Sequence, residues 1–294
     1  MEHDKKTFAV FGDVHGRITL MLMLSRAWEA ATGRTLDGVL QVGDMGAYPD
    51  LSRIDDATRR HAARDSDELG FSQYVHGCAE GADLLDHDGW PVVWMRGNHE
   101  DFDYLAGFHK PTAVDPWQRL LFLPDGQQHT LAGVRIGAMG GMAPRQERRG
   151  RGRTMRKKFR KEQASGDPRL VPRRLINTTF VDTVPHVLLT HAAPKTPELP
   201  FGSELLTNLC RRIHPRIHLF GHHHVALDPT TGPGGSTLIG LDHLDFRRNQ
   251  LQARCWGILE LEGNEVRWTW GDTFEWTRTL SRENYRQALR AVFA

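Results

Sequence analysis

Hydrophobic positions fall into short runs of about four to six residues, and each run ends at a glycine or histidine among other polar residues. Runs of this length that stop at a polar cluster are typical of buried β-strands followed by loops. Five such runs with their polar ends are TFAVFGDVHG (7–16), DGVLQVGDMG (37–46), WPVVWMRGNHE (90–100), PHVLLTHAAP (185–194) and RIHLFGHHH (216–224).

Helical patterns lie between these strands. They cover residues 18–31, 68–85 and 203–214. Because strands that alternate with helices favour a sheet covered by helices, the pattern predicts an α/β fold.

The later part of the chain has a different pattern. Residues 129–141, 236–244 and 255–270 are typical of antiparallel strands, the last a hairpin that turns near Gly263 and Asn264. A final helix is expected over residues 281–294, with Ser281 as its cap. The sheets of the α/β fold are therefore expected to be mixed.

Composition agrees with a water-soluble globular protein, since 39% of the residues are hydrophobic and 25% are charged. The three cysteines, Cys78, Cys210 and Cys255, are far apart and form no C-x-x-C pair, which favours a reducing compartment over a disulfide framework. The start of the chain has no signal-like apolar region, and the apolar stretch after residue 17 is shorter than the roughly 20 residues that span a bilayer. We expect one cytoplasmic domain over residues 1–294, with no membrane contact.

Positive charge is concentrated in one segment. Residues 145–174 hold 13 Lys and Arg against 3 Asp and Glu, a net charge of +10, so the rest of this +2 chain carries −8. Residues 143–174 lack apolar periodicity, which predicts an inserted loop that is mobile or ordered by a ligand. Such a loop would neutralise substrate phosphates, and a solvated insertion without a ligand is the alternative. The candidate substrate contacts are Arg148, Arg149, Arg151 and Arg153.

Polar side chains gather directly after the five strands. They are Asp13, His15, Asp44, Asn98, His99, His191, His222 and His224. Ligands of open α/β sheets bind beyond the carboxyl ends of the strands, so we expect these side chains to converge. Any single one could instead cap a helix, as Asp13 could, but that explanation fails for the whole set. Mixed oxygen and nitrogen donors suit Mn, Fe, Ni or Zn rather than Ca, and a bridging carboxylate would allow two ions.

The motifs that carry these residues form an ordered series. GDVHG (12–16), GD (43–44), GNHE (97–100), TH (190–191) and GHHH (221–224) resemble the five blocks of the calcineurin-like metallophosphoesterases. The resemblance implies a four-layer α/β/β/α sandwich with mixed sheets. It also implies two divalent ions, most readily Mn, and a metal-bound hydroxide that attacks phosphorus in line.

The resemblance also implies a role for each residue. Asp13, His15, Asp44 and His224 would hold the first ion, and Asp44, Asn98, His191 and His222 the second, with Asp44 as the bridge. His99 would stabilise the phosphoryl oxygens or protonate the leaving oxygen. His223 would be the variable middle residue of the last block. In an extended backbone, residues two apart face the same side, so His222 and His224 are expected to converge and His223 to point away.

The substrate is less constrained by the sequence. Serine/threonine phosphatases of this superfamily carry GDxxDRG where this chain has GDMGAYP (43–49), so it lacks the Arg that holds the phosphate and the Asp that orients the histidine. The partner of His99 is therefore open. A weaker resemblance to RNA lariat debranching enzymes covers about forty residues around GNHE, LAGVRIGAMGG and the insertion after them.

These observations favour a phosphodiester in a nucleic acid or nucleotide. The basic segment supports phosphate contact, but it holds a single aromatic residue, Phe159, so base stacking within it is poorly supported. One alternative is a phosphomonoesterase acting on proteins or small molecules. Another is a non-catalytic binding scaffold of the same fold, against which the seven intact ligand positions argue.

Overall fold

A computed structural model describes residues 5–85, 89–144 and 166–293 of the chain. Its larger sheet has seven strands. In spatial order these are β15 (Glu265–Trp270), β14 (Trp256–Glu262), β1 (Lys6–Phe11), β2 (Gly38–Gln41), β3 (Val92–Trp94), β5 (Leu120–Phe122) and β4 (Thr112–Ala113). The central strands β1, β2, β3 and β5 are parallel, and β14, β15 and β4 are antiparallel to their neighbours.

The second sheet has six strands. In spatial order these are β10 (Leu227–Thr231), β11 (Thr237–Gly240), β9 (Ile217–Phe220), β8 (Val187–Thr190), β7 (Val134–Met139) and β6 (Gln128–Leu131). The four inner strands are parallel and the two edge strands antiparallel. Mixed sheets are thus confirmed, but the antiparallel prediction for 236–244 was half wrong, because β11 pairs in parallel with β9. A separate pair joins β12 (Phe246–Arg247) to β13 (Gln250–Leu251).

Seven α-helices are described. They are α1 (Ile18–Thr32), α2 (Asp56–Ala62), α3 (Gly70–Val75), α4 (Phe102–Leu105), α6 (Arg173–Thr178), α7 (Glu204–Ile213) and α8 (Tyr285–Phe293). The single helix predicted over 68–85 was wrong, because the chain turns at Gly77, whose φ of 72° is left-handed. Ser281 accepts a hydrogen bond from the Asn284 amide at 3.2 Å, in the turn that precedes α8.

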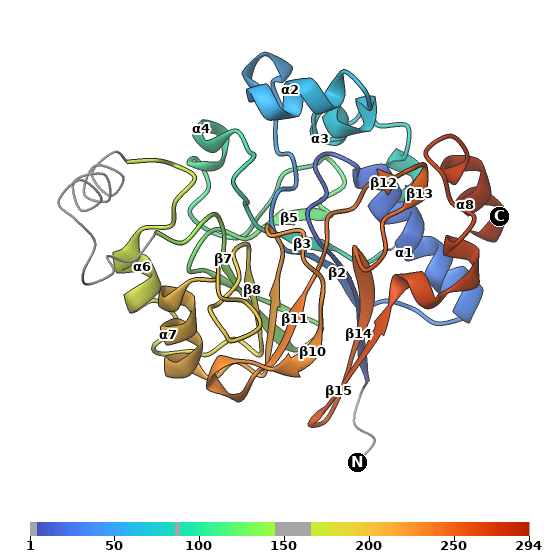
Figure 1. The fold of residues 1–294 in the computed structure, drawn as a ribbon. Coiled ribbons are helices and arrows are strands. Elements are labelled where there is room, and N and C mark those ends of the chain that lie inside the picture. The colour runs from blue at the N-terminus through green and yellow to red at the C-terminus, as the bar shows by residue number, and fades with distance from the viewer. Residues whose placement is uncertain (1–4, 86–88, 145–165, 294) are drawn as a thin grey trace.

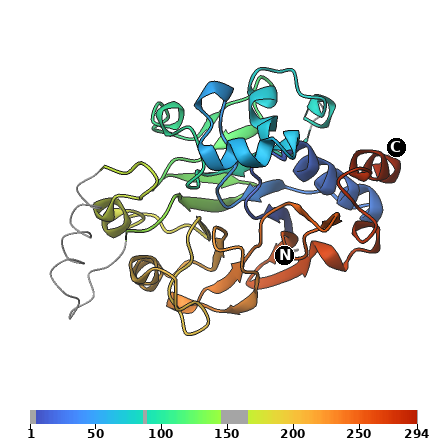
Figure 2. The ribbon, with the colours of Figure 1, turned by 45° about the horizontal axis from the view of Figure 1, so that its top comes forward.

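Alternation along β1 explains the layers. Phe8 and Val10 point into the core between the two sheets, whereas Ala9 and Phe11 point to the core under α1 and α8. On the other side, the outer face of the second sheet packs against α6 and α7 through residues such as Leu188 and Leu209. Figure 2 shows α1 beside α8 at one end and α6 beside α7 at the other. This is the predicted α/β/β/α sandwich.

The loops that follow the parallel strands meet at one edge of the two sheets. Close packing there requires glycine at two positions. A Cβ on Gly43, whose φ is 97°, would lie 2.5 Å from Nδ1 of His191, and a Cβ on Gly97 would lie 2.0 Å from Oδ1 of Asp44. These glycines therefore let the loops after β2, β3 and β8 touch one another.

The basic insertion is described only at its two ends. Its four candidate arginines, Arg148, Arg149, Arg151 and Arg153, lie outside the described residues. The returning chain pairs Leu170 with Met142, and Arg96 donates to the carbonyl oxygens of Pro168 (2.8 Å) and Leu170 (3.4 Å). Helix α6 begins at Arg173, so the predicted irregular segment ends slightly before residue 174.

Candidate metal centre

Two groups of metal-ligand side chains lie at the shared edge of the sheets. The first brings together Asp13, His15 and His224, and the second Asp44, His191 and His222. Within each group the donor atoms lie within 4.8 Å of one another. Asn98 joins the second group, because its Oδ1 lies 3.0 Å from Nε2 of His191. The structure therefore gathers all seven candidate ligands, from five separate loops.

Asp44 lies between the two groups. Its Oδ1 accepts hydrogen bonds from the amides of Asn98 (2.6 Å) and His99 (2.8 Å), which fix the carboxylate in place. Its Oδ2 lies 3.4 Å from Nε2 of His191 and 3.8 Å from Nε2 of His15. One oxygen of a buried carboxylate thus faces imidazoles of both groups, as a bridging ligand would.

The backbone that delivers these ligands is not extended. His15, Asp44, His222 and His224 have φ values of 45°, 53°, 64° and 49°. The prediction that His222 and His224 converge through strand alternation therefore has the wrong geometry, since each histidine enters a different donor group. His223 contacts His222 at 4.8 Å between ring centroids and Phe201 at 4.5 Å, outside both groups. Left-handed backbone at four non-glycine positions is strain of the kind that concentrates at functional sites.

The donors fit two divalent cations. Nδ1 of His191 lies 3.0 Å from the Val42 carbonyl oxygen, so in the tautomer with hydrogen on Nδ1 its Nε2 faces two oxygens, of Asp44 and Asn98. A cation between them satisfies all three atoms. Oδ2 of Asp13 is buried without a hydrogen-bond partner and lies 3.3 Å from Nε2 of His224, which is a second place for a cation.

The electrostatics of the groups agree with metal binding. Burial lowers the pKa of both His15 and His222 to about 4, so both imidazoles are neutral at neutral pH. Burial alone would raise the pKa of Asp44 and lower that of His191. The imidazoles around Asp44 together outweigh its burial and lower its pKa. The carboxylates of Asp44 and Asp13 outweigh the burial of His191 and raise its pKa to about 9, so a bound cation would displace a proton from His191. Neutral imidazoles and ionised carboxylates are the forms that bind divalent ions.

The partner of His99, which the sequence left open, is Asp55. Oδ2 of Asp55 lies 2.6 Å from Nδ1 of His99, and this hydrogen bond raises the pKa of His99. Asp55 also caps α2, because its Oδ1 accepts from the Thr58 amide at 2.7 Å. Sequence reasoning missed Asp55 because it stands eleven residues after Asp44, outside every motif. The only local signal was the cap itself, an acidic residue before a short helix.

Ion pairs fix the chain that carries Asp55. On one side of it, Arg53 binds Asp101 through two hydrogen bonds of 2.6 and 2.9 Å, which ties it to the loop of His99. On the other side, the buried guanidinium of Arg17 binds Asp65 and Glu68, each at 3.0 Å. Ion pairs therefore fix the chain both before and after Asp55, and this keeps Asp55 beside His99.

A second feature that was missed lies after β11. His243 stacks on His224 at 4.3 Å between ring centroids and is held by Asp242 at 2.8 Å. Together, His224, Asp242 and His243 form a third group with metal-ligand spacing. Sequence analysis did not single out His243. A polar cluster directly after the apolar run LIGL was the signal, and it is the same signal that identified the other five loops.

A cavity of about 250 Å³ opens over the donor groups. It is lined by His15, Asp44, Asn98, His222 and His224 from the groups themselves, and by His99, His61, Arg17 and His243 around them. The exposed His61, which sequence analysis did not single out, also lines this cavity. A substrate in this cavity would contact both donor groups and the His99 ring.

Fold and site together fit a metal-dependent hydrolase. A family comparison gives the narrower assignment: the chain belongs to the calcineurin-like phosphoesterase family, whose sequence profile matches residues 6–226. The protein is therefore a metal-dependent phosphoesterase. The match ends two residues beyond His224, so it spans all five loops of the site.

Solved structures resemble the chain at low identity. A phosphatase from Mycoplasma pneumoniae aligns with a TM-score of 0.45 and 11% identity, over 92% of this chain and 95% of its own. A 5'-nucleotidase precursor from Thermus thermophilus aligns with a TM-score of 0.39 and 14% identity, over 98% of this chain and 58% of its own. Among curated proteins, no sequence matches the chain significantly. In the described part of the chain, no helix is both long and apolar enough to span a membrane.

Proposed function

We propose that this protein hydrolyses phosphodiesters of nucleic acids or nucleotides at a centre of two divalent ions, with Mn as the working metal. Asp13, His15, Asp44 and His224 would hold one ion, and Asp44, Asn98, His191 and His222 the other. The observation that carries the two-ion assignment is the Asp44 carboxylate, which faces both donor groups. Such ions, when bound, supply Lewis acidity and lower the pKa of water near the phosphorus.

Two residues of the chain would supply the proton donor: His99 carries the proton, and Asp55 orients the His99 ring. Nδ1 of His99 is engaged by Asp55, so its Nε2 is the atom available to the substrate. A proton held there would pass to the leaving oxygen, or stay and stabilise the phosphoryl oxygens. The buried carboxylates of Asp13 and Asp44 accept hydrogen bonds from the amides of His222 and Asn98, which positions these two donors.

Charge supports a polyanionic substrate. The segment 145–174 carries +10, and its described foot is anchored through Arg96 to the loop that bears Asn98 and His99. The returning end of the basic segment is therefore attached to Arg96, two residues before Asn98, which supports neutralisation of phosphates beside the scissile one. A small phosphomonoester offers few phosphate contacts to that charge, so the segment favours a polyanion.

The substrate class is tested by initial rates with added Mn²⁺ on a bis-aryl phosphodiester and an aryl phosphomonoester. We expect the diester to be hydrolysed at least about tenfold more efficiently, a difference of roughly 1.4 kcal/mol in the barrier. Asp44→Asn provides the blank for contaminating activity. A preference for the monoester would overturn the phosphodiester proposal and favour a phosphatase. No turnover of either ester by protein loaded with metal would favour a scaffold.

Neutralising the basic segment provides a separate prediction. We would replace four arginines by Gln: Arg148, Arg149, Arg151 and Arg153. At low salt this should raise KM for single-stranded oligonucleotides by about tenfold, because fewer phosphate contacts release fewer counterions from the substrate. The slope of log KM against log salt should become shallower, and the turnover of the small bis-aryl ester should stay the same. Unchanged kinetics on oligonucleotides at low salt would show that these arginines do not contact substrate.

We also propose that residues 1–294 form one domain and that the protein is cytoplasmic. The pairing of β1 with β14 supports one domain, because it joins strands from the two ends of the chain. Unpaired Cys78, Cys210 and Cys255 support a reducing compartment.

A further inference from the structure

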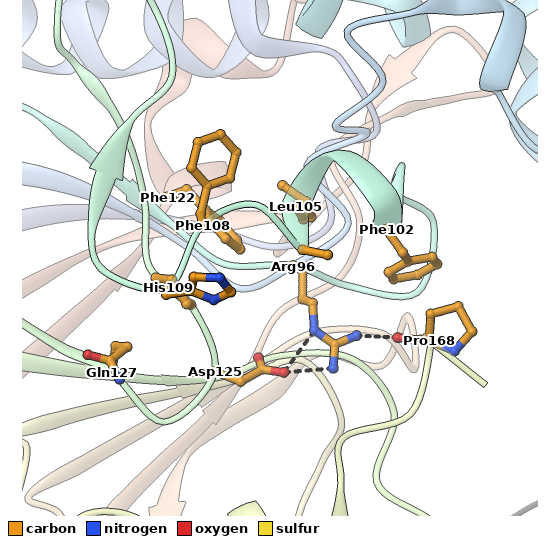
Figure 3. A pocket seen from close by; sticks show the side chains of 11 residues that line it. Arg96, Phe102, Leu105, Phe108, His109, Phe122, Asp125, Gln127 and Pro168 are labelled. Carbon is orange, nitrogen blue, oxygen red and sulfur yellow. Dashed lines mark hydrogen bonds and ion pairs between the residues drawn. The ribbon is translucent and has the colours of Figure 1, made fainter. Parts of the chain in front are cut away.

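A second cavity, of about 430 Å³, borders on the loop that carries Asn98 and His99. Its lining includes Arg96, which lies two residues before Asn98. It also includes Pro168, which belongs to the described end of the basic segment. Helix α4 and the chain after it supply the rest of the wall (Figure 3), notably Phe102, Leu105, Phe108 and His109. The cavity therefore lies between the loop of Asn98 and His99 and the foot of the most basic part of the chain.

The cavity presents aromatic rings that are held in place. Phe108 is half-buried and packs edge-on against Tyr104 at 5.1 Å and Phe122 at 5.9 Å between ring centroids. Phe102 is also half-buried, and the guanidinium of Arg96 lies over its ring at 5.8 Å. Rings fixed in this way lose little conformational entropy when a flat ligand stacks on them.

The charged groups at the rim of the cavity pair with one another. Arg96 is engaged by Asp125 at 2.8 Å and by the Pro168 carbonyl at 2.8 Å, so its guanidinium is held by the protein (Figure 3). His109 and Gln127 are exposed at the rim and offer hydrogen-bonding edges. Apolar rings with a few hydrogen-bonding groups suit a planar heteroaromatic ligand, and they do not suit a phosphate.

We propose that this cavity is a nucleobase subsite, in which a base of a single-stranded substrate stacks on Phe108 while the backbone runs from the metal centre toward Pro168. The proposal rests on the proposed phosphodiester function and names its substrate more closely. Binding of single strands combines cationic grooves with aromatic platforms, and the basic segment itself holds a single aromatic residue, Phe159. The platform comes instead from α4 and the chain that follows it.

The test is equilibrium binding of a labelled single-stranded oligonucleotide and of an abasic oligonucleotide of equal length and charge. The full-length Asp44→Asn protein is used so that the probe is not hydrolysed. We expect the base-bearing strand to bind about tenfold more tightly, and Phe108→Ala in this background to remove most of that advantage without changing abasic binding. Phe293→Ala is the matched control, because it truncates a half-buried phenyl on α8, on the opposite side of the molecule from α4 (Figure 1).

A second variant keeps the proposal testable if Phe108→Ala does not fold. His109 is exposed, so His109→Ala leaves the packing intact, and it should weaken the base-bearing strand alone. Equal binding of both strands, or equal loss in Phe108→Ala and Phe293→Ala, would overturn the subsite. The aryl ester rates test the proposed function independently of this binding experiment. If the protein prefers the diester but binds both strands equally, only the subsite is rejected. If it prefers the monoester but binds the base-bearing strand more tightly, only the phosphodiester assignment is rejected.

Discussion

Asp44→Asn should lower phosphodiester turnover by about 10³-fold or more, because this one carboxylate serves both donor groups. The change keeps the size of the side chain and one oxygen, so the Oδ1 contacts with the amides of Asn98 and His99 survive. What it removes is the negative charge and one oxygen donor of the proposed bridge. The measurement is kcat with saturating Mn²⁺, together with bound metal per chain by elemental analysis.

His223→Ala is the control for the loss of activity in Asp44→Asn. His223 lies beside two proposed ligands yet contributes to neither donor group. Its truncation should leave two ions per chain, whereas Asp44→Asn should lose at least one. If Asp44→Asn kept full turnover, the bridge would be wrong. If His223→Ala lost an ion, the ligand assignment in the GHHH loop would have to shift by one residue.

Asp55→Ala should lower kcat by about 10- to 100-fold while leaving the metal content unchanged, since it removes the group that orients a catalytic proton donor. The loss should grow with the pKa of the leaving group, because a poor leaving oxygen depends most on protonation. An alkyl ester should therefore suffer more than a nitrophenyl ester. The double variant Asp55→Ala, His99→Ala should be no slower than His99→Ala alone, because Asp55 acts through His99.

Asp56→Ala is the matched control for Asp55→Ala. Asp56 is the next carboxylate in the chain, is exposed, and begins α2 without contacting His99. It should leave kcat and the dependence on leaving group unchanged. An equal loss in Asp55→Ala and Asp56→Ala would point to helix stability rather than to orientation of the imidazole. A uniform loss across leaving groups in Asp55→Ala would remove the proton-donor role.

The strands and the convergence of their polar ends could be predicted because both depend on local patterns. A buried strand must be apolar, and the loop after it must bear the polar groups, so the site follows once the sheets form. Asp55 could not be predicted this way. Its position depends on the ion pair between Arg53 and Asp101 and on the buried Arg17, contacts that join residues about fifty positions apart.

Two errors have different physical origins. The ligand geometry of the GHHH loop was wrong because the backbone there is left-handed, which a motif of donor residues does not reveal. The long helix predicted over 68–85 failed at Gly77, where the left-handed backbone ends α3 and starts a turn. The cavity beside α4 was not predicted either, because its rings and Pro168 come together only in the folded chain.

The most direct test of the two-ion centre is a crystal structure with Mn²⁺, with data collected at the manganese absorption edge to locate the ions by anomalous scattering. The account predicts two peaks roughly 3.5–4 Å apart, on either side of the Asp44 carboxylate. One should lie among Asp13, His15 and His224, and the other among Asn98, His191 and His222. A single peak, or a peak held by His224, Asp242 and His243 in place of the first, would contradict it.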